Sequence, residues 1–227
     1  MRNILARNVK FWGKNTLESL GISLAGAAAV LLFLVAAGTD YSGQEGLLSY
    51  LTQLFPYYLF VAGVFVNSIL AISYFQVYFS VLLSMNVTRK EITLGILGSL
   101  TGCNLGILLL VQLVWRIFPE DISADCLRVF PLLTGILFLV TALLVILGVV
   151  ILRWGKIGTI IMGICFAVLG GFCGFWMSAA GRNGFDAEFF SALGRGDYSL
   201  VLAAGLLVYV LAGVFAVVMT RKTAVRV

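Results

Sequence analysis

Six long apolar stretches, separated by short polar gaps, organise this chain of 227 residues. The stretches cover 17–37, 56–83, 92–117, 129–152, 157–177 and 200–220. Each has roughly the 20 residues that an α-helix needs to cross a bilayer. The pattern predicts an all-α membrane protein with one transmembrane domain: a six-helix bundle over 17–220 and a short tail over 221–227. The stretch 153–156 is so short that the fourth and fifth spans are expected to form an antiparallel hairpin.

Residues 1–16 have the pattern of an amphipathic helix that lies on a membrane surface. The two faces recur at helical spacing: Leu5, Val9 and Trp12 on the apolar face, and Arg7, Lys10 and Lys14 on the basic face. The alternative, an unstructured basic tail, would leave Trp12 in water. We therefore expect an interfacial helix before the first span.

Charged residues sort by sign into alternate gaps between the spans. The gaps at 2–14, 89–91, 153–156 and 221–226 hold 11 of the 15 Lys and Arg, and the gaps at 40–45, 116–128 and 182–197 hold 8 of the 10 Asp and Glu. Basic residues stay on the cytoplasmic side of a membrane. Both termini are therefore expected in the cytoplasm of a cell whose plasma membrane holds the protein.

Composition agrees with a membrane protein and excludes some classes of function. Hydrophobic residues make up 61% and charged residues 11% of the chain, whereas soluble domains carry about 25% charged residues. The gaps are too short to fold as a catalytic domain. The net charge of +5 is explained by basic span ends beside anionic lipid, so nucleic acid is not an expected partner.

Several chemistries lack the residues that they need. The chain has no histidine, which excludes Ser-His proteolysis and HExxH metal sites. Its GxGD string at 194–197 has no second aspartate within a span to share a proton. No P-loop and no CxxC pair occur. We therefore expect no enzyme, no metal and no cofactor, and any ATP-driven work must use another polypeptide.

Neutral polar residues in the second span are the candidates for a translocation path. Asn67, Tyr74 and Tyr78 fall near one face of that helix. They would line a path for an amphipathic substrate or form a hydrogen-bonded seam between helices, and the sequence favours neither. In the third span, Gly98, Gly102 and Gly106 are spaced for close helix packing, within the chain rather than between two copies.

The sequence of the link between the second and third spans predicts a defined local structure. Thr88 is followed three residues later by Glu91, which is a capping box that predicts a helix starting at Arg89. The segment before it can continue the second span beyond the membrane edge. A rigid bend would then carry Arg89 and Lys90 into the cytoplasm.

The string 84–91, Ser-Met-Asn-Val-Thr-Arg-Lys-Glu, resembles the corresponding stretch of ABC-2-type transporter permeases, although many of those have Gly where Asn86 stands. The resemblance extends to an amphipathic helix before six spans and to outer helices before the last span. It implies that this link is a coupling helix that docks on a separate ABC ATPase subunit. The residues concerned are Met85, Asn86, Val87, Thr88, Arg89, Lys90 and Glu91. It further implies export of peptides, drugs or lipid-like molecules by two permease chains, the same or homologous.

Two other functions fit the same features. One is a substrate-capturing six-helix protein of the vitamin-uptake type, which also borrows an ATPase. The other is a membrane partner that transports nothing, such as an immunity or sensor subunit. The substrate and the direction of transport are not readable from these residues.

Overall fold

The computed structural model describes residues 2–36, 47–84, 87–117, 120–164, 167–168 and 198–221. These residues are almost entirely helical and contain no strand. The elements are α1 (Arg2–Ala36), α2 (Leu47–Ser73), the π-helix η1 (Tyr74–Tyr78), α3 (Phe79–Ser84), α4 (Arg89–Ile117), α5 (Glu120–Trp154) and α8 (Ser199–Arg221). A further helical stretch covers 156–164.

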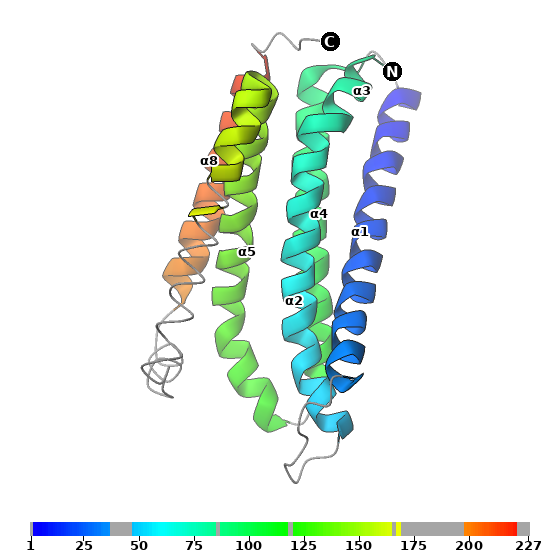
Figure 1. The fold of residues 1–227 in the computed structure, drawn as a ribbon, viewed down its shortest axis with the longest axis vertical. Coiled ribbons are helices and arrows are strands. Elements are labelled where there is room, and N and C mark those ends of the chain that lie inside the picture. The colour runs from blue at the N-terminus through cyan, green and yellow to red at the C-terminus, as the bar shows by residue number, and fades with distance from the viewer. Residues whose placement is uncertain are drawn as a thin grey trace.

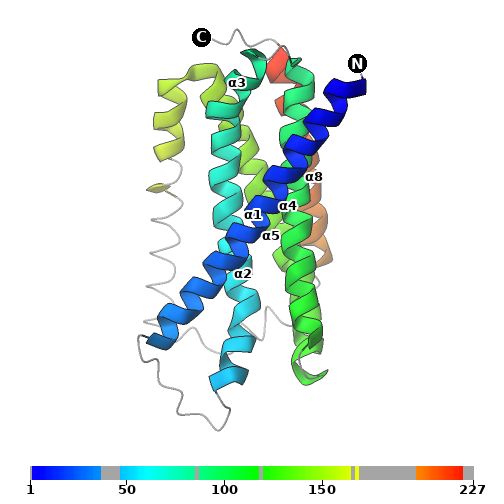
Figure 2. The same cartoon turned by 90° about the vertical axis from the view of Figure 1, so that its right-hand side faces the viewer.

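The long helices run side by side as a bundle, and α1 crosses it obliquely (Figures 1 and 2). Helix α5 packs most extensively against α8, whereas α1 packs against both α2 and α4. Helices α2 and η1 also contact α5, and α4 contacts α8. The second span therefore packs against α1, α4 and α5, while α4 contacts α1, α2, α5 and α8.

Five helices among the described residues are long and apolar enough to cross a membrane. They are Lys10–Phe33, Phe55–Ser84, Arg89–Val114, Val129–Trp154 and Ser199–Arg221. Helices able to span a membrane are therefore found at five of the six expected positions. Many large apolar side chains on their outer faces are exposed, for example Phe33, Phe65, Leu109 and Leu207. The expected span at 157–177 and the expected outer helix before the last span lie wholly or partly outside the described residues.

The structure does not confirm a separate interfacial helix at 1–16. Helix α1 continues from Arg2 to Ala36 without a break. Trp12 is only 9% exposed and packs edge-on against Tyr74, with their ring centroids 5.1 Å apart. An apolar face at helical spacing is the same signal whether a membrane surface or other helices cover it, which is why the sequence misplaced Trp12. On the opposite face Lys10 and Lys14 are exposed, and Lys14 pairs with Glu18 at 3.5 Å. The side chains of Leu5, Arg7 and Val9 lie outside the described part of the structure.

The basic segments gather at one end of the bundle. The start of α1, the link between α3 and α4, the turn after α5 and the end of α8 all lie at the top of Figure 1. Arg89, Lys90, Arg153, Lys156 and Arg221 belong to these segments. The segments predicted to share one side of the membrane therefore lie together, as far as they are described.

Glycines in the third span pack within the chain, as expected. Helix α4 lies so close to α1 that a side chain at Gly95 would collide with the indole of Trp12. A Cβ atom at Gly106 would lie 2.6 Å from Leu20 Cδ1. Gly98, by contrast, has no heavy atom within 4 Å of its Cβ position. Only part of the glycine stripe therefore serves the contact with α1.

Candidate functional site

The link between α3 and α4 contains the capping box that the sequence predicts. The Thr88 backbone N–H donates to Glu91 Oε2 at 3.1 Å, and the Glu91 backbone N–H donates to Thr88 Oγ1 at 3.4 Å. Helix α4 begins at Arg89, as expected. A cap of this kind typically stabilises a helix start by about 1 kcal/mol.

The second span reaches this link by a short extension. Helix α3 continues η1 to Ser84, and the Val87 N–H donates to the Leu82 carbonyl at 3.3 Å. Leu82 is buried and Val87 packs against the core. Met85 and Asn86 lie outside the described residues. Both sides of the link are therefore fixed to the bundle, so a force applied to the link would reach α2 and α4.

The cationic side chains of the link are accessible. Arg89 is half-buried and Lys90 is exposed. Among the described residues, the only ion pair joins Lys14 and Glu18, so neither cation of the link has a carboxylate partner there. The link can accordingly offer two positive charges to an acidic partner.

The start of α4 is also bonded to the end of α8. Thr93 and Thr220 are both fully buried, and their hydroxyl oxygens lie 3.0 Å apart. Thr93 also donates to the Arg89 carbonyl at 2.9 Å. A movement of the link would therefore be transmitted to α8 through this contact.

Asn67, the first candidate for a translocation path, belongs to a buried network with Asn104 and Thr141. Its Nδ2 atom donates to Asn104 Oδ1 at 2.6 Å and to Thr141 Oγ1 at 3.1 Å, and Asn104 Nδ2 donates to Thr141 Oγ1 at 3.0 Å. The three residues come from α2, α4 and α5 and are at most 1% exposed. The Oδ1 atom of Asn67 has no partner. In this conformation the three side chains form a seam between helices.

Tyr74, the second candidate, forms another contact between helices, about two turns from Asn67 along the span. Its hydroxyl lies 2.9 Å from Ser99 Oγ, which is 3.0 Å from Thr16 Oγ1. Tyr78, the third candidate, is half-buried and contacts the ring of Tyr74 at a centroid distance of 5.6 Å. The π-helix places these residues, since its wider turn changes which side chains face the core.

Sequence reasoning missed the partners of these polar residues. Asn104 was visible as a polar residue in the third span, but Thr141 and Ser99 were not singled out. Thr141 and Thr134 are the polar residues within the otherwise apolar fourth span. A polar side chain in such a span is costly unless it is bonded, which is the signal that would have found Thr141.

The network predicts different effects for two polar residues of α4. Asn104→Leu should remove two bonds from Asn67 and Thr141 and destabilise the protein by about 1–2 kcal/mol. Gln112→Leu is the matched control, because Gln112 is half-buried and its side chain makes no hydrogen bond to any described residue. Thermal unfolding in mild detergent measures both. Equal melting temperatures for the two variants would contradict the network.

Comparison of the chain with protein-family models, with curated proteins and with solved structures finds no match. The function must therefore be argued from the residues and their geometry.

Proposed function

We propose that this chain is the membrane-spanning permease subunit of an ABC transporter. The proposal includes a sixth span at 157–177, for which the helical stretch 156–164 provides a start. It places the basic end of the bundle, and with it both termini, in the cytoplasm of a bacterial cell. The chain would then act with a second permease chain and with separate ATPase subunits, and would have no catalytic residues of its own.

The link between α3 and α4 is the observation that carries the proposal. It is short, it is capped by Thr88 and Glu91, and it presents Arg89 and Lys90 at the basic end. A reciprocal cap is a common way to begin a helix, and in this short basic link it also fixes the backbone that carries the two cations. An element that transmits force between two proteins needs such rigidity, because a flexible loop would absorb the motion.

The path for the substrate is proposed along the face of the second span that holds Asn67, Tyr74 and Tyr78. These side chains are engaged in the seams described above, so opening a path requires the seams to separate. Neutral hydrogen bonds suit that role, because each is worth about 1 kcal/mol between membrane helices and can be exchanged. The unpartnered Oδ1 of Asn67 is available to a substrate once the seam opens.

Reversing the charges of the link tests the proposal. Arg89→Glu with Lys90→Glu should abolish co-purification with the proposed ABC ATPase subunit, or leave ATP hydrolysis uncoupled from transport. Arg221→Glu with Lys222→Glu makes the same change of charge in the tail that the sequence predicts to be cytoplasmic, and should retain the complex. The readouts are the amount of bound ATPase and its activity in reconstituted vesicles.

Correct insertion must be verified in the same variants. In a background without the four native cysteines, a cysteine at Ser42 should react with an impermeant thiol reagent from outside, and one at Thr223 should not. A correctly inserted Arg89→Glu, Lys90→Glu variant that still binds and stimulates the ATPase would reject the docking role. A vitamin-uptake subunit would instead bind a small ligand without any ATPase, and a sensor subunit would bind its partner without transport.

A further inference from the structure

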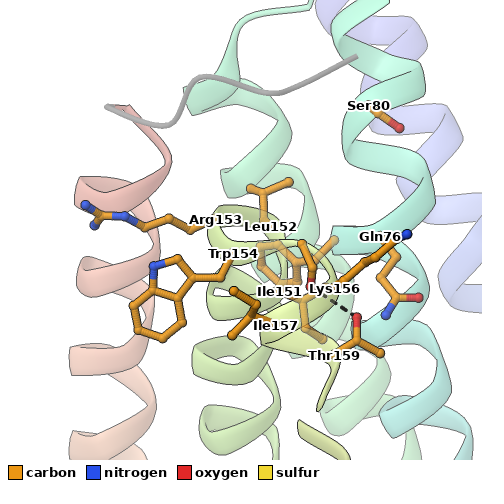
Figure 3. Close-up of a pocket in the computed structure, with 11 residues that line it drawn as sticks. Gln76, Ser80, Ile151, Leu152, Arg153, Trp154, Lys156, Ile157 and Thr159 are labelled. Carbon is orange, nitrogen blue, oxygen red and sulfur yellow. Dashed lines mark hydrogen bonds between the residues drawn. The ribbon is translucent and has the colours of Figure 1, made fainter. Parts of the chain in front are cut away.

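A cavity of about 820 Å³ lies at the basic end of the bundle, between the second span and the turn that follows α5 (Figure 3). One wall comes from η1 and α3, and the other from the end of α5 and the start of the stretch 156–164. The lining residues are Phe75, Gln76, Ser80, Ile151, Leu152, Arg153, Trp154, Gly155, Lys156, Ile157 and Thr159. Its volume is typical of sites that hold a small organic ligand.

The backbone on both sides of the cavity is specialised. Gly155 has a φ of 56°, a conformation that side chains disfavour, and the chain reverses there. On the opposite wall, Phe75 is buried against Gly148, where a side chain would collide with its ring. Gln76, the next residue of the π-helix, is exposed toward the cavity. The second span thus directs the Gln76 amide to the cavity, while the adjacent Phe75 packs the helix against α5.

The charge at the cavity is positive and uncompensated. Arg153 and Lys156 flank the turn and are exposed, and no carboxylate of the described residues pairs with either. Figure 3 shows Arg153 directed toward α8, where its Nη1 atom lies 3.1 Å from the Met219 sulfur. A thioether is a weak acceptor, so the guanidinium retains donors for an anion.

The hydroxyl groups of Ser80 and Thr159 suit a ligand that also donates hydrogen bonds. The Ser80 hydroxyl donates to the Val77 carbonyl at 2.9 Å, and the Thr159 hydroxyl donates to the Gly155 carbonyl at 3.3 Å. Their oxygens therefore remain as acceptors toward the cavity. The hydroxyl groups of a lipid headgroup can donate to both oxygens. Apolar lining residues such as Ile151 and Leu152 suit the acyl chain of a lipid, which inorganic phosphate lacks.

We propose that this cavity binds the headgroup of an anionic phospholipid, of the phosphatidylglycerol type, from the leaflet at the basic end. Lys156 would neutralise the phosphate, joined by Arg153 once its side chain turns from Met219 toward the cavity, and the glycerol hydroxyls would donate to Ser80 and Thr159. Apolar lining residues such as Ile157 would receive the upper part of an acyl chain. Basic pockets between membrane helices are a recurrent way to hold anionic lipids. This site does not depend on the proposed transport function.

Retention of lipid by the purified chain tests the site. The protein is exchanged into micelles of a neutral detergent with phosphatidylcholine, phosphatidylglycerol or both, and the bound lipid is counted by native mass spectrometry. We expect preferential retention of phosphatidylglycerol. Arg153→Gln with Lys156→Gln should weaken retention by about tenfold or more, while Arg221→Gln with Lys222→Gln, which removes the same charge elsewhere, should retain it.

Two further arms separate the lipid from simpler explanations. Ser80→Trp should expel the lipid by filling the cavity with both cations intact. Inorganic phosphate at millimolar concentration should not displace the lipid. Equal losses in the two glutamine double variants would overturn the site. Displacement by inorganic phosphate would overturn the assignment to a lipid, because it would identify a site for a free anion.

Discussion

Gly205→Ala is expected to push α8 away from α5 and to cost about 2–3 kcal/mol of stability, as overpacking does in well-packed interiors. The added Cβ atom would collide with the carbonyl oxygen of Gly135 on the facing helix and would lie 2.9 Å from its Cα atom. These are backbone atoms, so no side chain can rotate to make room. The two helices form the most extensive contact of the bundle, and their separation would therefore be felt across the structure.

Gly213→Ala is the matched control on the same helix. Its Cβ atom would lie 3.5 Å from Leu97 Cδ1, which is ordinary van der Waals contact. Alanine also favours a helix over glycine by about 1 kcal/mol, so this variant should be neutral or slightly stabilised. Both are compared by thermal unfolding of the purified protein in mild detergent. A Gly205→Ala variant that melts as late as Gly213→Ala would show that α5 and α8 do not approach as closely as described.

The parts of the fold that depend on local chemistry were predictable from the sequence. Span positions follow from apolar length, because a bilayer imposes that length on each helix. The start of α4 at Arg89 follows from Thr88 and Glu91, whose bonds reach only three residues. The turn after α5 follows from the brevity of 153–156, which leaves the chain no room for anything but a reversal.

Contacts between distant residues were not predictable in the same way. Asn67 could be recognised as polar within a span, but its partners Asn104 and Thr141 are 37 and 74 residues away. No residue type in Tyr74–Tyr78 signals the π-helix that forms there. In that helix Phe75 faces the core and Gln76 faces the cavity. The cavity itself depends on that turn and on Gly155 together, so neither segment alone indicates it.

Trp12→Ala is the second substitution with a large expected effect, and it separates the two positions proposed for this residue. In the structure the indole lies in the core, edge-on to Tyr74 and against the backbone of Gly95. Removing a buried tryptophan costs about 3–5 kcal/mol in well-packed proteins, because the cavity left behind closes only in part. At a membrane surface the same change would weaken lipid contact and leave the fold of the purified protein intact.

The control is Phe33→Ala, since Phe33 is on the same helix and is 72% exposed. If Trp12 belongs to the core, its variant should melt well below Phe33→Ala in detergent, where no bilayer surface exists to bind. The loss should also reach Tyr74, whose contact with Ser99 would no longer be braced by the indole. Equal melting temperatures for the two variants would instead indicate that Trp12 lies at the membrane surface. The start of α1 would then be the interfacial helix that the sequence predicts. The comparison distinguishes the two arrangements because the same apolar face of α1, with the same periodicity, would serve in either. Only what covers that face differs: other helices or a membrane surface.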